Sequence, residues 1–338
     1  MGATKSLLWR KAAFVKFIEI IKSSVGLYSE NGVYGNLYIL NEYTGVPIGT
    51  RIVGRLEHSP YMSHIASGRT KPSENTSTYK NNLSDTYVWL KRDEDAALRM
   101  GWNNFKAIGA PWLYFLELKK LHGFTNSIPL SERHIDELWV FANHSVVEFE
   151  GGVTSEMREF FNGVRGSKAN TKLVSLFYTD FLSLSRQDRE EFADLNIVTL
   201  LGSRTRSSSA NAHLYTLFHI LGNVKSLVLD FPSTMMLYAI TLNCEIKWFK
   251  NATYFSVKRE AEKLDSLKLL ELMGDEQTTS EFRMEFADQE LGRSSLKSPS
   301  ELRDLFAWST SGLKISHALY RTCRCLLSAP YRYLRREK

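Results

Sequence analysis

The chain has 338 residues, 43% of them hydrophobic and 24% charged, and carries a formal net charge of +6. This composition is globular and excludes a disordered, collagen-like or coiled-coil protein. The length predicts two domains, and the basic balance favours a phosphate-bearing ligand, nucleic acid or an anionic membrane surface as partner. No segment reaches the roughly 18 uncharged apolar residues of a spanning helix. The three cysteines form no CxxC pair, so we expect no structural zinc and no disulfide framework, which suits a reducing cytoplasm.

Short apolar segments alternate with amphipathic segments along most of the chain. A first series of strands is predicted at residues 37–40, 51–56, 86–90 and 105–108, and a second at residues 138–141, 173–178, 197–201, 226–229 and 245–249. Helices are predicted at residues 92–100, 155–164, 185–194, 210–221 and 234–242. Strands that alternate with helices indicate parallel βαβ units.

The two series of strands predict two Rossmann-like halves. Gly123, Asn126 and Pro129 interrupt the pattern between them. We therefore expect the following parts: an N-terminal domain over residues 1–125, a second domain over residues 126–255, and a helical C-terminal region over residues 256–338 with a basic amphipathic tail.

Basic and apolar side chains interleave at both ends of the chain, in residues 5–22 and from residue 312 onward. Two interpretations stay open for these ends. They are helices packed on the protein with solvated basic faces, or segments that contact an anionic membrane.

Polar residues follow the predicted strands of the second half, at the edge where open α/β sheets bind ligands. His144 and Ser145 follow the first of these strands, and an imidazole N–H or a hydroxyl can hydrogen-bond a phosphate. Thr179 and Asp180 follow the next strand. Asp180 could accept a hydrogen bond from a base or a ribose, or it could cap the following helix.

Two further strand ends carry features suited to an anion. Gly202, Ser203 and Arg204 follow one strand, where glycine permits close approach of a ligand and arginine pairs with phosphate. A solvated turn is the alternative there. Ser233 and Thr234 stand at the start of a predicted helix, whose N–H groups and dipole favour an anion. Simple helix capping is the alternative for these two residues.

In the first half, Glu57 and His58 end a predicted strand and would face the cleft between the domains. A carboxylate or an imidazole there could deprotonate an acceptor hydroxyl. A polar pair satisfied within the cleft wall is an equally open interpretation.

Six segments in this order resemble a group of bacterial polysaccharide-biosynthesis proteins that work in capsule, lipopolysaccharide or O-antigen assembly and have the GT-B glycosyltransferase fold. They are residues 57–58, 101–114 (GWNNFKAIGAPWLY), 140–145 (VFANHS), 177–180 (FYTD), 198–203 (VTLLGS) and 229–242 (LDFPSTMMLYAITL). The layout also resembles bacterial GT-B sialyltransferases, whose His-Pro and Ser-Ser or Ser-Thr motifs hold the phosphate of a CMP-activated acidic sugar. Here His144 is followed by Ser145 instead of proline, and Ser233-Thr234 corresponds to the second motif.

The resemblance implies an α/β protein of the GT-B kind, with two Rossmann-like domains facing a central cleft. It implies a glycosyltransferase that needs no metal and no cofactor. The nucleotide-sugar donor would bind His144, Ser145, Thr179, Asp180, Gly202, Ser203, Arg204, Ser233 and Thr234, and Glu57 or His58 would be the catalytic base. The acceptor would be a surface polysaccharide or a lipid-linked glycan.

Three other expectations follow. The protein would lie in the cytoplasm or at the inner face of the cytoplasmic membrane, because the basic ends would contact anionic lipid. No helix-turn-helix, RRM or zinc-finger signature is present, so we expect no nucleic-acid partner. The alternative function is a non-catalytic binding or scaffolding subunit of a polysaccharide-assembly complex, since a fold does not imply an activity.

Overall fold

The fold is that of a computed structural model of the chain. The structure describes residues 33–48, 50–52, 54–57, 85–124, 128–141, 153–176, 180–181, 184–198, 213–230, 233–249 and 279–308. Both basic ends of the chain lie outside these residues. So do several predicted site residues, namely His58, His144, Ser145, Thr179, Gly202, Ser203 and Arg204.

The first sheet contains three parallel strands in the order β1-β2-β3. They are β1 (Arg55–Leu56), β2 (Thr86–Val88) and β3 (Phe105–Ala107). Three helices accompany this sheet along the chain: α2 (Asn36–Thr44) before β1, α4 (Lys91–Arg99) between β2 and β3, and α5 (Pro111–Leu121) after β3. A 3-10 turn, η1 (Val33–Gly35), leads into α2.

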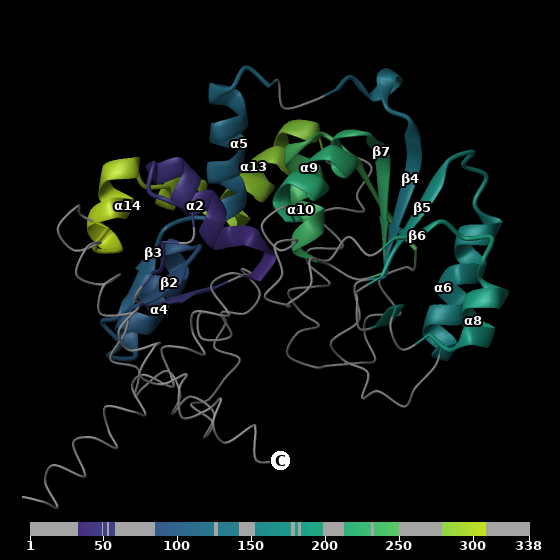
Figure 1. Ribbon diagram of the computed structural model, residues 1–338, viewed down its shortest axis with the longest axis horizontal. Coiled ribbons are helices and arrows are strands. Elements are labelled where there is room, and N and C mark those ends of the chain that lie inside the picture. The colour runs from purple at the N-terminus through teal and green to yellow at the C-terminus, as the bar shows by residue number, and fades with distance from the viewer. Residues whose placement is uncertain are drawn as a thin grey trace, which may run out of the picture.

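The second sheet contains five strands, all parallel, in the order β6-β5-β4-β7-β8. The strands are β4 (Ile135–Val140), β5 (Lys172–Ser175), β6 (Ile197–Val198), β7 (Val224–Leu229) and β8 (Glu245–Trp248). Numbered within the sheet, this order is 3-2-1-4-5, which is the strand order of a Rossmann-type doubly wound sheet. β4 is therefore the central strand, with its successors on both sides (Figure 1).

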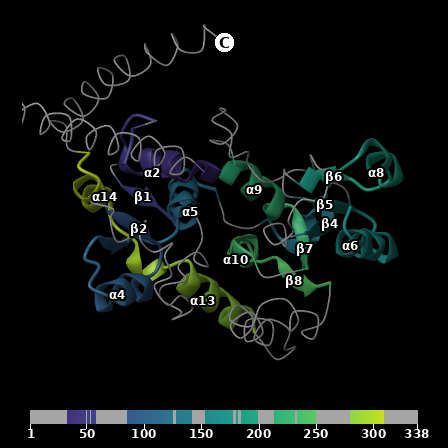
Figure 2. The same ribbon diagram turned by 90° about the horizontal axis from the view of Figure 1, so that it is seen from below.

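Alternating side chains of β4 enter two different core layers. Leu138 and Val140 pack with α9 (His213–Gly222) and α10 (Thr234–Thr241), while Trp139 and Phe141 pack with α6 (Ser155–Gly166). A strand that is buried on both faces needs apolar residues at consecutive positions, which explains the unbroken run at the end of β4. Figure 2 shows α9 and α10 on one side of the strands, and α6 together with α8 (Arg186–Glu191) on the other.

Trp112 of α5 joins the two sheets. Its indole ring is fully buried and stacks on Tyr238 of α10, with 4.4 Å between ring centroids. Its Nε1–H donates a hydrogen bond of 2.8 Å to Thr241 Oγ1, at the end of α10. The hydrophobic core of the first sheet is therefore continuous with the α9 and α10 layer of the second.

The last described segment of the chain returns to the first sheet. It consists of α13 (Ser280–Glu290), the 3-10 turn η6 (Arg293–Ser295) and α14 (Pro299–Leu305). Ala110 N–H donates to Leu291 O at 2.8 Å, and Tyr87 Oη–H donates to Leu305 O at 3.2 Å. Gly292, at φ +72°, lies so close to β2 that a Cβ atom would overlap the carbonyl oxygen of Trp89.

The α/β class and the parallel sheets are confirmed. The predicted strands at 86–90, 105–108, 138–141, 226–229 and 245–249 correspond to β2, β3, β4, β7 and β8. The helices predicted between them also form, as do helices in the C-terminal region.

Two sequence interpretations are wrong. Residues 37–40 were expected as a strand but lie in α2, because Gly35 and Gly45 adopt left-handed conformations that delimit a helix around this apolar run. The helix α5 was not predicted. Its nearly uniform apolar character hides the helical period, since seven of its eleven residues, at positions 111–116 and 118, are buried.

The two sheets lie on either side of residue 125. Beyond residue 256, α13 packs against α10 and α14 packs against α2. Among the residues that the structure describes, no helix combines the length and apolar character needed to cross a membrane.

We expect Gly292→Ala to destabilise the fold by about 2–4 kcal/mol, because a Cβ would meet the Trp89 carbonyl at a backbone angle that favours glycine. Urea denaturation measures this difference. Gly166→Ala at the end of α6 is the matched control, because nothing lies within 4 Å of the added methyl group. Equal stabilities of the two variants would contradict the close approach of η6 and β2.

Candidate functional site

The carboxyl edge of the second sheet is the strongest candidate for a ligand site. The strand order reverses between β4 and β7, since β5 and β6 lie on one side of β4 and β7 and β8 on the other. The pairing of β4 with β7 extends to Val140 and Leu229 at their carboxyl ends. Open α/β sheets bind ligands at such a switch point, beyond the ends of the strands.

Ser233 lies at this edge, directly before α10. Its backbone is extended, at φ −142° and ψ 162°, and it occupies the N-cap position without a side-chain hydrogen bond to the helix. Its Oγ is buried and has no hydrogen-bond partner among the described residues. Capping by the Ser233 side chain, the simpler explanation, is thus not what the structure contains.

Other helices of the chain show the contrast. The side chains at the N-caps of four helices accept a hydrogen bond from their own helix, as a capping residue should. These residues are Thr154 before α6, Ser185 before α8, Thr279 before α13 and Ser298 before α14. The Ser233 hydroxyl is therefore not used by its own helix, although it lies next to the positive end of the α10 dipole.

A second buried hydroxyl, that of Ser175, lies at the end of β5. Ser175 is fully buried, and its Oγ also lacks a hydrogen-bond partner within the described part of the chain. It stands beside Val140 in the register of β4 and β5, so its side chain lies on the face covered by α9 and α10. Sequence reasoning missed Ser175, because a serine within a strand gives no sign of its burial.

Two buried carboxyl groups lie at the same edge. Asp230 follows β7, and Asp180 follows β5 by a few residues. Burial raises the pKa of Asp180 to about 6, so its carboxyl group exchanges a proton near neutral pH. Carboxyl oxygens accept hydrogen bonds from hydroxyl groups of a ribose or a sugar, whereas they repel phosphate. An anion would therefore bind at Ser233, and the hydroxyl-bearing parts of the same ligand would lie near Asp180 and Asp230.

Thr234 is the first residue of α10 and is half-buried. The remaining predicted donor-binding residues lie outside the described residues and stay predictions. Within the described ranges, no group of three or more His, Cys, Asp or Glu side chains has the arrangement of a metal site.

Glu57 directly follows β1 and is buried. Its Oε1 lies 3.0 Å from Arg55 Nε, and its backbone carbonyl accepts a hydrogen bond of 2.9 Å from Trp89 Nε1. The Arg55 guanidinium therefore already engages this carboxylate. His58, the other predicted base, follows Glu57 outside the described residues.

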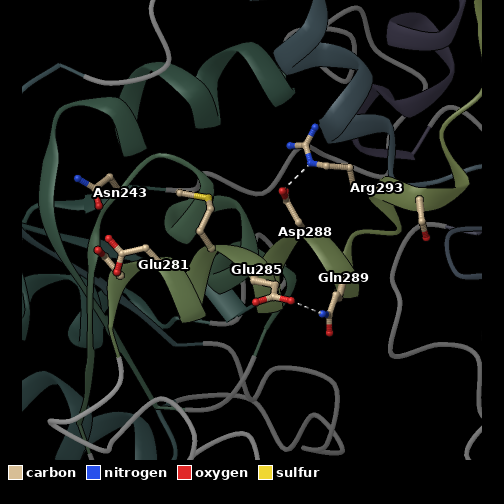
Figure 3. A pocket seen from close by; sticks show the side chains of 9 residues that line it. Asn243, Glu281, Glu285, Asp288, Gln289 and Arg293 are labelled. Carbon is tan, nitrogen blue, oxygen red and sulfur yellow. Dashed lines mark hydrogen bonds and ion pairs between the residues drawn. The ribbon is translucent and has the colours of Figure 1, made fainter.

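A groove lies elsewhere, between α13 and the turn after α10, with a volume of about 690 Å³. Figure 3 shows Glu281 and Glu285 along it, with Asp288 turned toward Arg293. The Asp288 carboxylate pairs with Arg293 at 2.6 Å. Asn243, on the opposite wall, stands at the far end of α10 from Ser233. The acidic lining of this groove does not suit a phosphate group.

No protein-family model matches the chain, and a search of curated proteins finds no match either.

We expect Ser175→Ala to stabilise the ligand-free protein by about 1 kcal/mol, because it removes a buried hydroxyl that lacks a partner. Ser226→Ala is the matched control on β7, since its buried hydroxyl donates a 2.7 Å hydrogen bond to Glu245 and its loss should destabilise. Urea denaturation compares the two. Destabilisation of similar size in both variants would mean that Ser175 is hydrogen-bonded.

We also expect Asp180→Asn to change how stability depends on pH. The folded-state pKa is raised, so the folded protein holds this proton more tightly than the unfolded chain, and the stability contribution is lost as pH rises through about 6. Relative to Asp180→Asn, the wild type should lose about 2–3 kcal/mol between pH 4 and pH 7.5.

Chemical denaturation at several pH values measures this difference. Asp136→Asn is the control of opposite sign, because a hydrogen bond from Lys225 and others from Thr171 lower the pKa of the Asp136 carboxyl. Its contribution is lost as pH falls. Parallel pH profiles for wild type and Asp180→Asn would exclude the raised pKa.

Proposed function

We propose that this protein is a metal-independent glycosyltransferase of the GT-B type. It would transfer a sugar from a nucleotide-activated donor to a surface polysaccharide or a lipid-linked glycan. The observation that carries the proposal is the buried, unpartnered hydroxyl of Ser233 at the switch point of a sheet with Rossmann strand order. A second parallel α/β unit, which GT-B enzymes require, supports it.

In this proposal the donor phosphate binds at the start of α10. The Ser233 hydroxyl donates a hydrogen bond to a phosphate oxygen, and the helix dipole stabilises the negative charge. Asp180 and Asp230 accept hydrogen bonds from ribose or sugar hydroxyls. Ser175 lies two strands from β7 and adds a second hydroxyl on the same face of the sheet.

The reaction needs a stabilised leaving group and a base. The acceptor oxygen forms a bond to the anomeric carbon of the donor sugar, the bond from that carbon to the phosphate oxygen breaks, and the acceptor proton passes to the base. The charge that develops on the leaving phosphate is the charge that Ser233 and α10 can stabilise. His58 is the preferred base of the two predicted, because Arg55 already engages the Glu57 carboxylate.

The resemblance to sialyltransferases favours a CMP-activated acidic sugar among the possible donors. The site we infer also suits other nucleotides, since a hydroxyl and a helix N-terminus recognise the phosphate and not the base. The proposed setting is the cytoplasm, at or near the inner face of the membrane.

The second candidate is a non-catalytic subunit that binds a nucleotide or glycan within a polysaccharide-assembly complex. The Arg55–Glu57 ion pair favours it, because a carboxylate held in this way serves structure as well as chemistry. The two candidates differ in turnover: both predict ligand binding at Ser233, and only the first predicts release of the free nucleotide in the presence of acceptor.

We expect one class of nucleotide to raise the melting temperature of the wild type in a thermal-shift screen of CMP, UDP, GDP, their sugars and inorganic phosphate. The shift should disappear in Ser233→Ala and in His144→Ala, because each loses a predicted donor to the phosphate. Ser233→Ala should melt at or slightly above the temperature of the ligand-free wild type, because it removes a buried hydroxyl that has no hydrogen-bond partner within the described structure.

Ser185→Ala is the matched control. Ser185 forms a capping box on α8, so this variant should melt lower while keeping the full ligand shift. No shift with any nucleotide would overturn the donor site. If Ser233→Ala keeps the ligand-induced rise in melting temperature, the ligand binds away from the start of α10.

A further inference from the structure

The groove between α13 and the turn after α10 has no role in the candidate site, and its charges are unevenly matched. Three carboxylates and one guanidinium line it, those of Glu281, Glu285, Asp288 and Arg293 (Figure 3). The lining therefore carries an excess of negative charge, which favours a cationic occupant.

The excess negative charge belongs to two glutamates. Asp288 pairs with Arg293 at 2.6 Å, and Arg293 also lies 3.7 Å from Glu117. Glu281 and Glu285 are exposed, and neither forms an ion pair with a basic side chain in the described part of the chain. A cation that enters the groove would therefore find these two carboxylates without a competing ion pair.

The carboxylates of the groove share one face of α13. Glu285 follows Glu281 by four residues and Asp288 follows Glu285 by three, which are the spacings of neighbours on a helix surface. The row is about 10 Å long. Like charges at these spacings repel each other, and Arg283, the basic residue of α13, is not among the residues that line the groove. A row of basic groups laid along α13 would relieve this repulsion.

The groove also offers apolar surface and room for side chains. Met284 lies between the two glutamates in the helix and lines the groove with them. The volume of about 690 Å³ is within the range of sites that receive a ligand of several side chains in size. The lining therefore suits a peptide segment in which basic and apolar residues are interleaved.

The chain itself contains such a segment at its C-terminal end. Residues 312–338 include seven Lys or Arg residues against one acid, Glu337, with leucines and tyrosines between them. The basic segment at the other end, residues 5–22, has five against one. The described part of the chain ends at Trp308. The residues that follow can extend to about 100 Å, so the groove is within their reach.

We propose that residues 312–338 bind along the α13 groove, with basic side chains at Glu281 and Glu285 and an apolar side chain on Met284. Of the two interpretations that the sequence leaves open for this end of the chain, the groove favours packing on the protein. The groove lies at the far end of α10 from Ser233. The interaction needs neither donor nor acceptor, so it stands apart from the proposed transferase activity.

Cross-linking within the full-length chain tests this contact. In a Cys325→Ser background, Ser280→Cys places a thiol in the groove, Cys323 is the thiol of the C-terminal segment, and Cys244 is buried. After treatment with a bismaleimide, mass spectrometry of tryptic peptides should find position 280 linked to Cys323 in monomeric protein. The matched control is Leu98→Cys on α4, which is 58% exposed and should give a severalfold lower yield.

Charge variants give a second measurement. Glu281→Gln combined with Glu285→Gln should lower the cross-link to the level of the Leu98→Cys control, and so should high salt, because opposite charges attract the segment to the groove. Glu132→Gln is the matched control, because Glu132 is an exposed glutamate of the 3-10 turn η4 (Leu130–Glu132). It should leave the yield unchanged.

Four outcomes would overturn the proposal. Equal yields at positions 280 and 98 would exclude a specific contact, and a yield that survives the double substitution would exclude the role of the two glutamates. Links found only in covalent dimers would assign the groove to a second copy of the chain. An NBD label on Cys323 that brightens with anionic vesicles, in a protein without the link at position 280, would assign the segment to the membrane.

Discussion

The contact of Trp112 with α10 fixes the relation between the two sheets. A buried indole brings a large apolar surface and one polar N–H, and both are satisfied here: the ring stacks on Tyr238, and the N–H reaches Thr241 Oγ1. Thr241 in turn donates a hydrogen bond to the carbonyl of Tyr238. Ser233 stands at the start of the same helix, α10. The Trp112 contact therefore also fixes the candidate site relative to the first sheet.

Much of the second sheet could be predicted from its sequence. Strands such as β7 are short, apolar and closed by polar residues, and the carboxyl edge of a parallel sheet follows from chain order alone. The left-handed backbone at Gly35 and Gly45 could not be predicted, and without it residues 37–40 give the same apolar pattern as a strand. The helix α5 was not predicted for a related reason: because it is buried on most sides, its sequence lacks the alternation of apolar and polar residues that marks a helix.

The candidate site was predictable in part. Ser233 and Asp180 were found because they follow predicted strands, but their burial is a tertiary property. The sequence around Ser233 is equally compatible with ordinary capping, as at Ser185, and only the backbone geometry separates the two. Ser175 needed the register with β4 and the assignment of a face before it could be recognised. Glu57 stands where expected, but its ion pair with Arg55 is visible only in space.

The return of η6 and α14 to the first sheet has a consequence for the order of assembly. The second sheet is built from contiguous chain, residues 128–249, whereas the contacts of Ala110 with Leu291 and of Tyr87 with Leu305 join residues 181 and 218 positions apart. Such long loop closures are entropically costly and slow. During synthesis from the N-terminus, the first sheet is made earliest and completed last, and the strands of the second sheet can pair while the first sheet awaits η6 and α14.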